Sequence, residues 1–136
     1  MTEKERKIKI TAGKHVLVAK LQENEAVRAL WNKLPQTYSM QNLYEREMCF
    51  RMGKGSLPAK EAKYTGYKIG DISYWPPRGS LVILYAQNGE IFEQQPIGHI
   101  ADDVTFFKNL GDTKIKFEGW RNNHERTQRI SYWQDQ

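Results

Sequence analysis

The sequence is poor in cysteine and has no long apolar run. Cys49 is the single cysteine among 136 residues, so neither an internal disulfide nor a cysteine-based metal site is possible. No uninterrupted apolar segment approaches the roughly 18 residues that a membrane-spanning helix needs, and we expect no membrane partner. Residues 1–7 are charged and lack the apolar stretch of a signal peptide. These absences predict a cytoplasmic protein.

Catalytic and metal-binding motifs are also missing. The histidines His15, His99 and His124 lie far apart and form no metal-ligand spacing, and there is no Gly-x-Ser-x-Gly elbow. Residues 53–56 (GKGS) lack the spacing of a phosphate-binding loop. A lone cysteine is more often a small packing residue than a nucleophile, and Glu47 is expected to be solvated. We therefore predict no catalytic residue, no metal and no cofactor.

The composition is that of a folded chain with a mild positive charge. Hydrophobic residues make up 39 % and aromatic residues 12 %, which is too rich for a disordered chain. The 21 basic and 16 acidic residues give a net charge of +5, which identifies no particular partner. We expect one domain over residues 1–118 and a polar C-terminal tail over residues 119–136. The oligomeric state is left open.

Alternation of apolar and polar residues predicts a series of short strands. Residues 7–11 and 16–21 form one predicted hairpin. Residues 72–75 and 81–85 form a second hairpin about a Pro-Pro-Arg-Gly turn, because prolines cannot donate to a sheet and belong to the bend. Further strands are expected at residues 47–52, 96–100 and 114–118.

Two helices are predicted from capping residues and helical spacing. Asn24 and Asp102 are candidate N-caps, because a side-chain oxygen there accepts a hydrogen bond from a free N–H of the first turn. The apolar residues behind the caps lie on one helix face each: Val27, Leu30, Trp31 and Leu34, then Val104, Phe107 and Leu110. Residues 57–68 are expected to form a long surface loop. The pattern predicts a mainly β domain whose antiparallel sheet closes into a barrel with helices over its ends.

Three stretches resemble the cyclophilin-like proteins, small bacterial barrels of uncharacterised function. They are the motif GDISYWPP at residues 70–77, the apolar strand that ends at Tyr85, and the motif IGHI at residues 97–100. The resemblance covers about residues 7–118. It implies a closed antiparallel cyclophilin-like β-barrel of about eight strands with two short covering helices.

A second resemblance is to the true cyclophilins, which are peptidyl-prolyl isomerases. The motif GSLVIL at residues 79–84 is similar to their Gly-Ser-Gln-Phe-Phe-Ile strand, and Phe50-Arg51 is similar to the strand that carries their catalytic arginine. Leu81 replaces the glutamine, Ile83 replaces the aromatic floor of the proline pocket, and residues 86–95 contain neither tryptophan nor histidine. The resemblance implies the barrel, with no enzymatic activity as the favoured expectation and prolyl isomerisation as the alternative.

We expect a mainly apolar cleft, at the open side or mouth of the barrel, that binds a small molecule or a peptide segment. Its predicted ligand-binding residues are Phe50, Arg51, Tyr74, Trp75, Ile83 and Tyr85. The apolar members would supply walls, and Arg51 would donate to a carboxylate or carbonyl. Core packing is the competing interpretation for Ile83 and Tyr85, and a solvated side chain paired with Glu47 is the competing interpretation for Arg51.

A barrel that binds single-stranded nucleic acid is the alternative from another class. Such barrels stack bases on aromatic side chains within a basic groove. Lysine and aromatic residues interleave here at Lys60, Lys63, Tyr64, Tyr67, Lys68, Tyr74 and Trp75. Acidic residues such as Glu61 and Asp71 dilute this charge, so nucleic acid is the less favoured partner.

Overall fold

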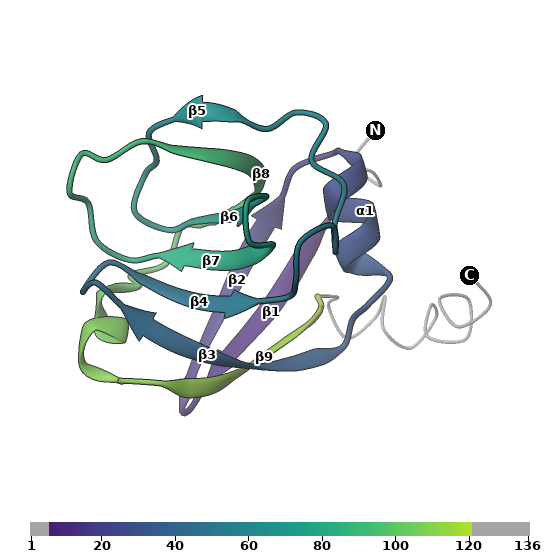
Figure 1. Cartoon of the computed structure of the whole chain (residues 1–136). Coiled ribbons are helices and arrows are strands. Elements are labelled where there is room, and N and C mark those ends of the chain that lie inside the picture. The colour runs from purple at the N-terminus through teal and green to yellow at the C-terminus, as the bar shows by residue number, and fades with distance from the viewer. Residues whose placement is uncertain (1–5, 121–136) are drawn as a thin grey trace, which may run out of the picture.

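The computed structural model describes residues 6–120. These residues form nine strands, one α-helix and one 3₁₀ helix (Figure 1). Their bounds are β1 Lys7–Ala12, β2 His15–Leu21, α1 Glu25–Trp31, β3 Gln36–Leu43, β4 Glu47–Arg51, β5 Lys63–Thr65, β6 Asp71–Trp75, β7 Ser80–Leu84, β8 Phe92–Ile100, the 3₁₀ helix Thr105–Asn109 and β9 Thr113–Gly119.

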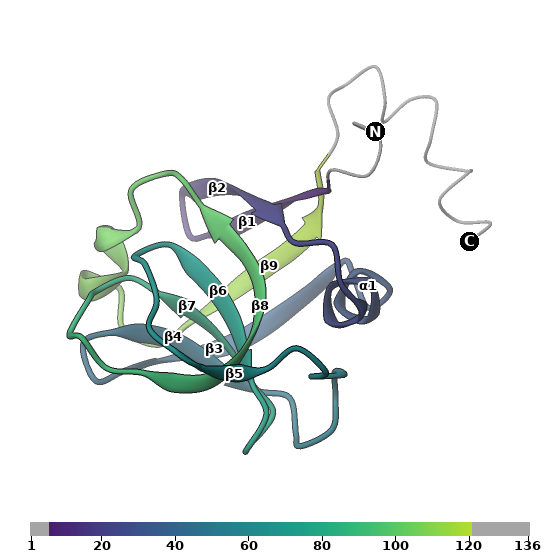
Figure 2. The same cartoon turned by 90° about the horizontal axis from the view of Figure 1, so that it is seen from above.

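Eight of these strands in the described range close an antiparallel barrel. The strand order is β2-β1-β9-β3-β4-β7-β6-β8, and a further pairing of β2 with β8 joins the two ends of the sheet. Figure 2, which views the molecule from above, shows these eight strands as a closed ring. The short strand β5 lies outside this ring and pairs with β8. The predicted fold class, a closed antiparallel barrel, is confirmed.

Barrel closure depends on the absence of a side chain at Gly98. At the seam, Lys20 pairs with His99 and Leu21 pairs with Gly98. A Cβ atom at Gly98 would lie 2.6 Å from the carbonyl oxygen of Lys20, which is too close for any other residue without a shift of backbone. The IGHI motif therefore has a structural reason, because its glycine lets β8 approach β2.

The two covering helices lie at opposite ends of the barrel (Figures 1 and 2). Helix α1 begins as predicted, with the Asn24 side chain accepting a 2.9 Å hydrogen bond from the Val27 N–H. The second helix is a single 3₁₀ segment rather than an α-helix, and its predicted cap was wrong. Asp103 accepts from the Thr105 backbone at 2.9 Å, whereas Asp102 accepts from the Val18 N–H of β2.

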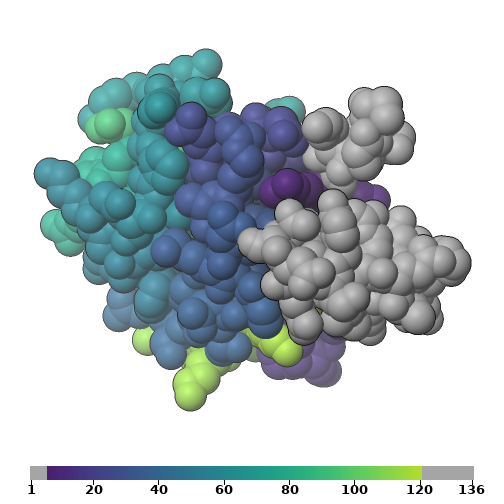
Figure 3. Space-filling model, turned by 90° about the vertical axis from the view of Figure 1, so that its right-hand side faces the viewer, coloured from purple at the N-terminus to yellow at the C-terminus, as the bar shows by residue number. Residues whose placement is uncertain are grey.

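Helix α1 also contacts the segment that follows β4. Figure 3 views this side of the molecule, with residues of α1 beside those of that segment. Lys60 Nζ lies 3.4 Å from Glu25 Oε1. Leu57 of the same segment is buried in the main core, where its backbone N–H donates to the Tyr74 hydroxyl. The segment is thus attached to α1 through Lys60 and to the barrel core through Leu57.

Two separate apolar clusters pack on the two faces of the same strands. The larger one fills the barrel interior and includes Tyr74, Leu81 and Ile83. The smaller one lies on the outer face, where Cys49, Val82 and Leu84 are covered by buried Tyr67 together with partly buried Trp75 and Phe92. Strand β7 is consequently buried along its whole length, as expected for a strand with both faces covered.

The region predicted as one long loop differs from that prediction. Residues 57–68 contain β5, and buried Leu57 and Tyr67 attach the region to the two clusters. Strand β3, which the alternation did not assign, buries Tyr38 and Met40 between polar neighbours. No helix within residues 6–120 is long and apolar enough to cross a membrane. The predicted tail lies outside the described residues, apart from its first two positions.

Candidate functional site

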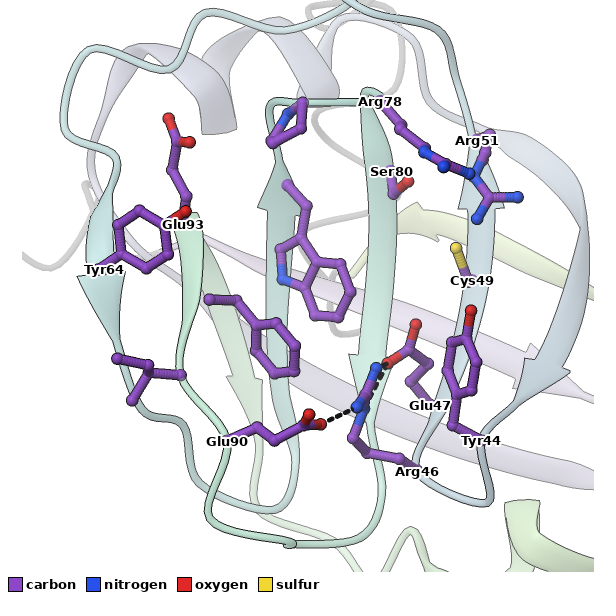
Figure 4. A pocket seen from close by; sticks show the side chains of 14 residues that line it. Tyr44, Arg46, Glu47, Cys49, Arg51, Tyr64, Arg78, Ser80, Glu90 and Glu93 are labelled. Carbon is purple, nitrogen blue, oxygen red and sulfur yellow. Dashed lines mark hydrogen bonds and ion pairs between the residues drawn. The ribbon is translucent and has the colours of Figure 1, made fainter.

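A pocket of about 580 Å³ lies on the outer face of the barrel, above β4, β7 and β6. The strands form its floor, and the smaller apolar cluster stands beside it. Figure 4 shows the side chains that line it. They come from β4, β5, β6, β7, the two hairpin turns, the connection from β7 to β8 and the start of β8. They are Tyr44, Arg46, Glu47, Cys49, Arg51, Tyr64, Trp75, Pro77, Arg78, Ser80, Glu90, Ile91, Phe92 and Glu93.

The structure places the six predicted ligand-binding residues on two opposite faces of the sheet. Arg51 and Trp75 line the outer pocket. Tyr74, Ile83 and Tyr85 are buried in the barrel core, and half-buried Phe50 packs against that core with its ring 4.7 Å from the Tyr38 ring. Successive side chains of a strand point to opposite faces, so Phe50 and Arg51 lie on different sides, as do Tyr74 and Trp75.

One row of side chains crosses the pocket floor from strand to strand. Arg51 of β4 pairs with Ser80 of β7, and Ser80 pairs with Trp75 of β6. Adjacent strands are about 4.8 Å apart, so this row spans roughly 10 Å of backbone. Trp75 stacks on Phe92, with ring centroids 4.3 Å apart. The row therefore joins a cation, a hydroxyl and an aromatic wall.

A cluster of charged groups occupies one end of the pocket. Arg46 Nε donates a 2.6 Å hydrogen bond to Glu47 Oε1, and a second nitrogen of the same guanidinium pairs with Glu90 (Figure 4). The Glu47 side chain is only 1 % exposed, so the expectation of a solvated glutamate was wrong. Burying a carboxylate is costly without a partner, and Arg46 supplies that partner.

Aromatic rings surround the same guanidinium. The Arg46 Cζ atom lies 4.6 Å from the centre of the Phe92 ring, 5.0 Å from that of Tyr44 and 5.7 Å from that of Trp75. Such cation–π contacts strengthen when the cation is removed from water, as it is here. Arg46 thus has its charge balanced by the protein itself, and it closes that end of the pocket.

The turn that carries Arg46 has a strained backbone. Leu43 pairs with Glu47 across a three-residue connection in which Tyr44 and Glu45 have φ values of 59° and 51°. Residues with a Cβ adopt this left-handed region at a cost, and hairpin turns of this kind usually contain Asn or Gly. The conformation places Tyr44 at the pocket rim beside Arg46.

Burial changes the proton affinity of two groups in the pocket. Burial raises the pKa of Glu47 above its usual value, although the hydrogen bond and charge of Arg46 act in the opposite direction. Burial likewise raises the pKa of the Cys49 thiol, against a smaller opposite effect of hydrogen bonding with Ser80. A raised thiol pKa reduces the thiolate fraction, which agrees with Cys49 as a packing residue.

Tyr67 holds the loop that carries Glu90. Its hydroxyl donates a 2.7 Å hydrogen bond to the Ala86 carbonyl oxygen and accepts one from the Asn88 N–H. The Gln87 side-chain amide donates in turn to the Tyr67 carbonyl oxygen at 2.6 Å. These bonds fix the loop next to the pocket and thereby position Glu90 against Arg46.

The described histidines, His15 and His99, do not line the pocket. His99 is exposed, with Nδ1 2.9 Å from Asp71 Oδ1, and His15 stacks on Phe106. Within the described range no three His, Cys, Asp or Glu side chains cluster closely enough to hold a metal ion. Of the aromatic residues considered for base stacking, Tyr67 and Tyr74 are buried and Tyr64 is exposed.

Comparison with known proteins identifies the family. A model of the cyclophilin-like family matches residues 10–118, which is most of the barrel. The chain belongs to the cyclophilin-like family. No curated protein matches its sequence.

A solved structure supports the same fold for this cyclophilin-like chain. The solution structure of the hypothetical protein AF2241 from Archaeoglobus fulgidus superposes with a TM-score of 0.65 at 18 % identity. The match covers 85 % of this chain and 95 % of the other. At this identity the likeness establishes a shared barrel. The predicted resemblance to cyclophilin-like proteins is thus confirmed.

The residues that sequence reasoning missed come mainly from turns of this cyclophilin-like domain. Arg46 and Arg78 lie in hairpin turns and Glu90 lies in the connection from β7 to β8, and the path of such segments over the sheet cannot be deduced from periodicity. One signal did exist. The unbroken apolar run at residues 81–85 indicates a strand buried on both faces, and therefore a second layer on the outer face of the sheet.

Proposed function

We propose that the outer-face pocket binds a small organic molecule and that the protein is a ligand-binding domain without covalent chemistry of its own. The main support is the built cavity of about 580 Å³. Pockets for small molecules usually have roughly 300–1,000 Å³ and combine apolar walls with a few placed polar groups. The Trp75–Phe92 pair supplies such a wall, and Arg51 and Ser80 supply polar groups next to it.

Thermal shift against a broad metabolite library tests this proposal. A ligand that binds only the folded state raises the melting temperature by mass action. We expect stabilisers to act on the wild type and on Phe106→Leu, whose ring stacks on His15 away from the pocket. They should fail to stabilise Trp75→Leu, which removes one aromatic wall. Equal stabilisation of Trp75→Leu, or no stabiliser across the library, would contradict the proposal.

Prolyl isomerisation is a second candidate, and the position of Arg51 favours it. Arg51 is the residue that resembles the catalytic arginine of cyclophilins, and its exposed side chain lines the pocket. Rotation about a prolyl bond faces a barrier of about 20 kcal/mol, which a donor to the amide nitrogen lowers. A proline-peptide exchange assay should then show acceleration that Arg51→Ala abolishes. Absence of acceleration in the wild type removes this candidate.

A further inference from the structure

Two of the three arginines in the pocket form no ion pair with a described acidic residue, although the charge of Arg51 acts on Glu47 and Glu93 also lines the pocket. Arg46 is paired with both Glu47 and Glu90. Arg51 and Arg78 are exposed, and neither forms an ion pair with any residue in the range 6–120. At one end of the pocket the arginine is paired with glutamates, and at the other end the two arginines have no ion-pair partner among the described residues.

The two free arginines lie at the same end of the pocket. Figure 4 shows Arg51 and Arg78 together beside Ser80, with Arg46, Glu47 and Glu90 at the opposite end. Arg51 is directly paired with Ser80 across the β4–β7 ladder, and Arg78 precedes Ser80 by two residues in the β6–β7 turn. Both the strand register and the side-chain positions in Figure 4 therefore place Arg51 and Arg78 close together.

The turn that carries Arg78 is fixed in place by its neighbour Gly79. Gly79 has φ +65°, and a Cβ atom there would lie 1.9 Å from the carbonyl oxygen of Gly53. The Met52 N–H donates a 2.8 Å hydrogen bond to the Gly79 carbonyl oxygen. These contacts hold the turn against the chain that leaves β4, so Arg78 and Arg51 are presented from two segments packed on each other.

A buried hydroxyl lies in the floor beneath the two arginines. Ser80 is buried, and its hydroxyl lies between Arg51 and Trp75 in the row across the strands. Two like-charged guanidinium groups repel each other, and an oxyanion placed between them relieves that repulsion and accepts their hydrogen bonds. Guanidinium groups fit carboxylate and phosphate oxygens in bidentate geometry.

We propose that Arg51 and Arg78 bind the anionic group of the ligand, a carboxylate or a phosphate, while a planar part of the same molecule packs on Trp75 and Phe92. This inference rests on the proposed ligand-binding function and adds the chemical class of the ligand. The Ser80 hydroxyl donates to the same oxyanion. Arg51 and Trp75 lie two strands apart in the same row, so one small molecule can contact both side chains.

Three matched probes test the inference by chemical-shift titration of the full chain at low ionic strength. They are 2-naphthoate, 2-naphthyl phosphate and the neutral isostere 2-naphthamide. We expect both anions to shift the backbone signals of Ser80 and the indole signal of Trp75. The amide should bind at least about tenfold more weakly, because a charge-assisted hydrogen bond is lost. The order of the two anions distinguishes a carboxylate site from a phosphate site.

Variants of single arginines assign the binding to the two side chains. Arg51→Gln and Arg78→Gln should each weaken 2-naphthoate binding by about tenfold. Arg28→Gln is the matched control, because Arg28 is an exposed arginine of α1 far from the pocket in the fold, and it should leave the affinity unchanged. Arg51 and Arg78 are exposed, so their variants are expected to keep the fold.

The outcomes separate the inference from the proposed function. Equal affinity for 2-naphthamide and 2-naphthoate, with both arginine variants unaffected, overturns the anion site and leaves a ligand pocket. Shifts that map outside the pocket also overturn the anion site. If none of the three probes shifts any pocket signal at millimolar concentration, the inference fails, whereas the proposed function is decided by the thermal-shift library.

Discussion

Arg46 and Glu47 are neighbours in the chain and form a buried ion pair, with Arg46 Nε donating to Glu47 Oε1 at 2.6 Å. The pair lies in the pocket on the outer face of the barrel, where Glu90 and three aromatic rings complete its surroundings. This ion pair explains how Glu47, the first residue of β4, can be buried although it carries a carboxylate. Loss of Arg46 would leave the Glu47 carboxylate buried without its partner.

Removing the cation should therefore be costly. In Arg46→Met the Glu47 carboxylate stays buried without its partner, and we expect the free energy of unfolding to fall by about 3–5 kcal/mol. Urea denaturation monitored by circular dichroism measures this change. The double variant Arg46→Met/Glu47→Gln should be more stable than Arg46→Met, because no uncompensated charge remains. A loss below about 1 kcal/mol in Arg46→Met would contradict the structural account.

The stability of the protein should depend on pH through Glu47. Its pKa is raised in the folded state, so the folded protein binds the proton more tightly than the unfolded chain does. Stability from this group is present below the ordinary glutamate pKa and decreases as the pH rises through the folded pKa. Glu47→Gln should remove this decrease, which denaturant titrations at several pH values measure.

Asp103 provides a control of opposite sign for this pH dependence. Hydrogen bonds from the Thr105 N–H and hydroxyl lower the pKa of Asp103. Its contribution is present above the ordinary aspartate pKa and is lost as the pH falls through the lowered value. Asp103→Asn should therefore remove this acid-side decrease in stability and leave the slope at higher pH unchanged. Identical profiles for the wild type and Glu47→Gln would show that the burial of Glu47 has no such effect.

Gly79→Ala should destabilise the protein more than an equivalent change at another left-handed glycine. At Gly79 the new methyl group would lie 1.9 Å from the Gly53 oxygen, whereas at Gly13, with φ +61°, nothing lies within 4 Å. Gly13→Ala should cost about 1 kcal/mol from the backbone conformation alone. Gly79→Ala should cost clearly more and should also weaken binding at Arg78. Equal melting temperatures of the two variants would contradict the close approach.

Glycine at position 45 should stabilise the protein. Glu45 has φ 51°, a conformation that costs a residue with a Cβ roughly 1 kcal/mol and costs glycine little. Glu45→Gly should therefore raise the free energy of unfolding by up to about 1 kcal/mol. Lys54→Gly, at an exposed position outside the set of residues with positive φ, is the control and should not be stabilising. A lower melting temperature for Glu45→Gly than for Lys54→Gly would contradict this prediction.

The barrel was predictable because alternation is a strong signal in this chain. Strands β1, β4, β6 and β9 follow from apolar positions two residues apart, and β2 and β7 follow from apolar runs. Asn24 marks the start of α1. Strand β3 was missed because Tyr38 and Met40 are its only fully buried positions. Strand β5 was missed because three residues paired with one neighbour carry no periodic signal.

The location of the pocket was less predictable, for a physical reason. Alternation shows which residues share a face, but it does not say which face is covered by loops. Arg51 and Trp75 were identified as candidates, and the structure places both in the outer pocket. Tyr74 and Ile83 belong to the other face and fill the barrel. Arg78 and Glu90 depend on turn geometry, which only tertiary structure supplies.

Strand β7, which is covered on both sides, forms the base of the pocket, and we expect its hydrogen bonds to open rarely. Every one of its residues is buried, and its amide hydrogens pair with β4 and β6. The backbone amides of β7 should therefore exchange with deuterium last, whereas the peripheral strand β5 should open at a much lower free energy and exchange earlier. A ligand would accordingly contact a rigid strand, β7, at the base of the pocket and a more flexible strand, β5, at its rim. Conformational adaptation to the ligand should therefore be confined to the rim.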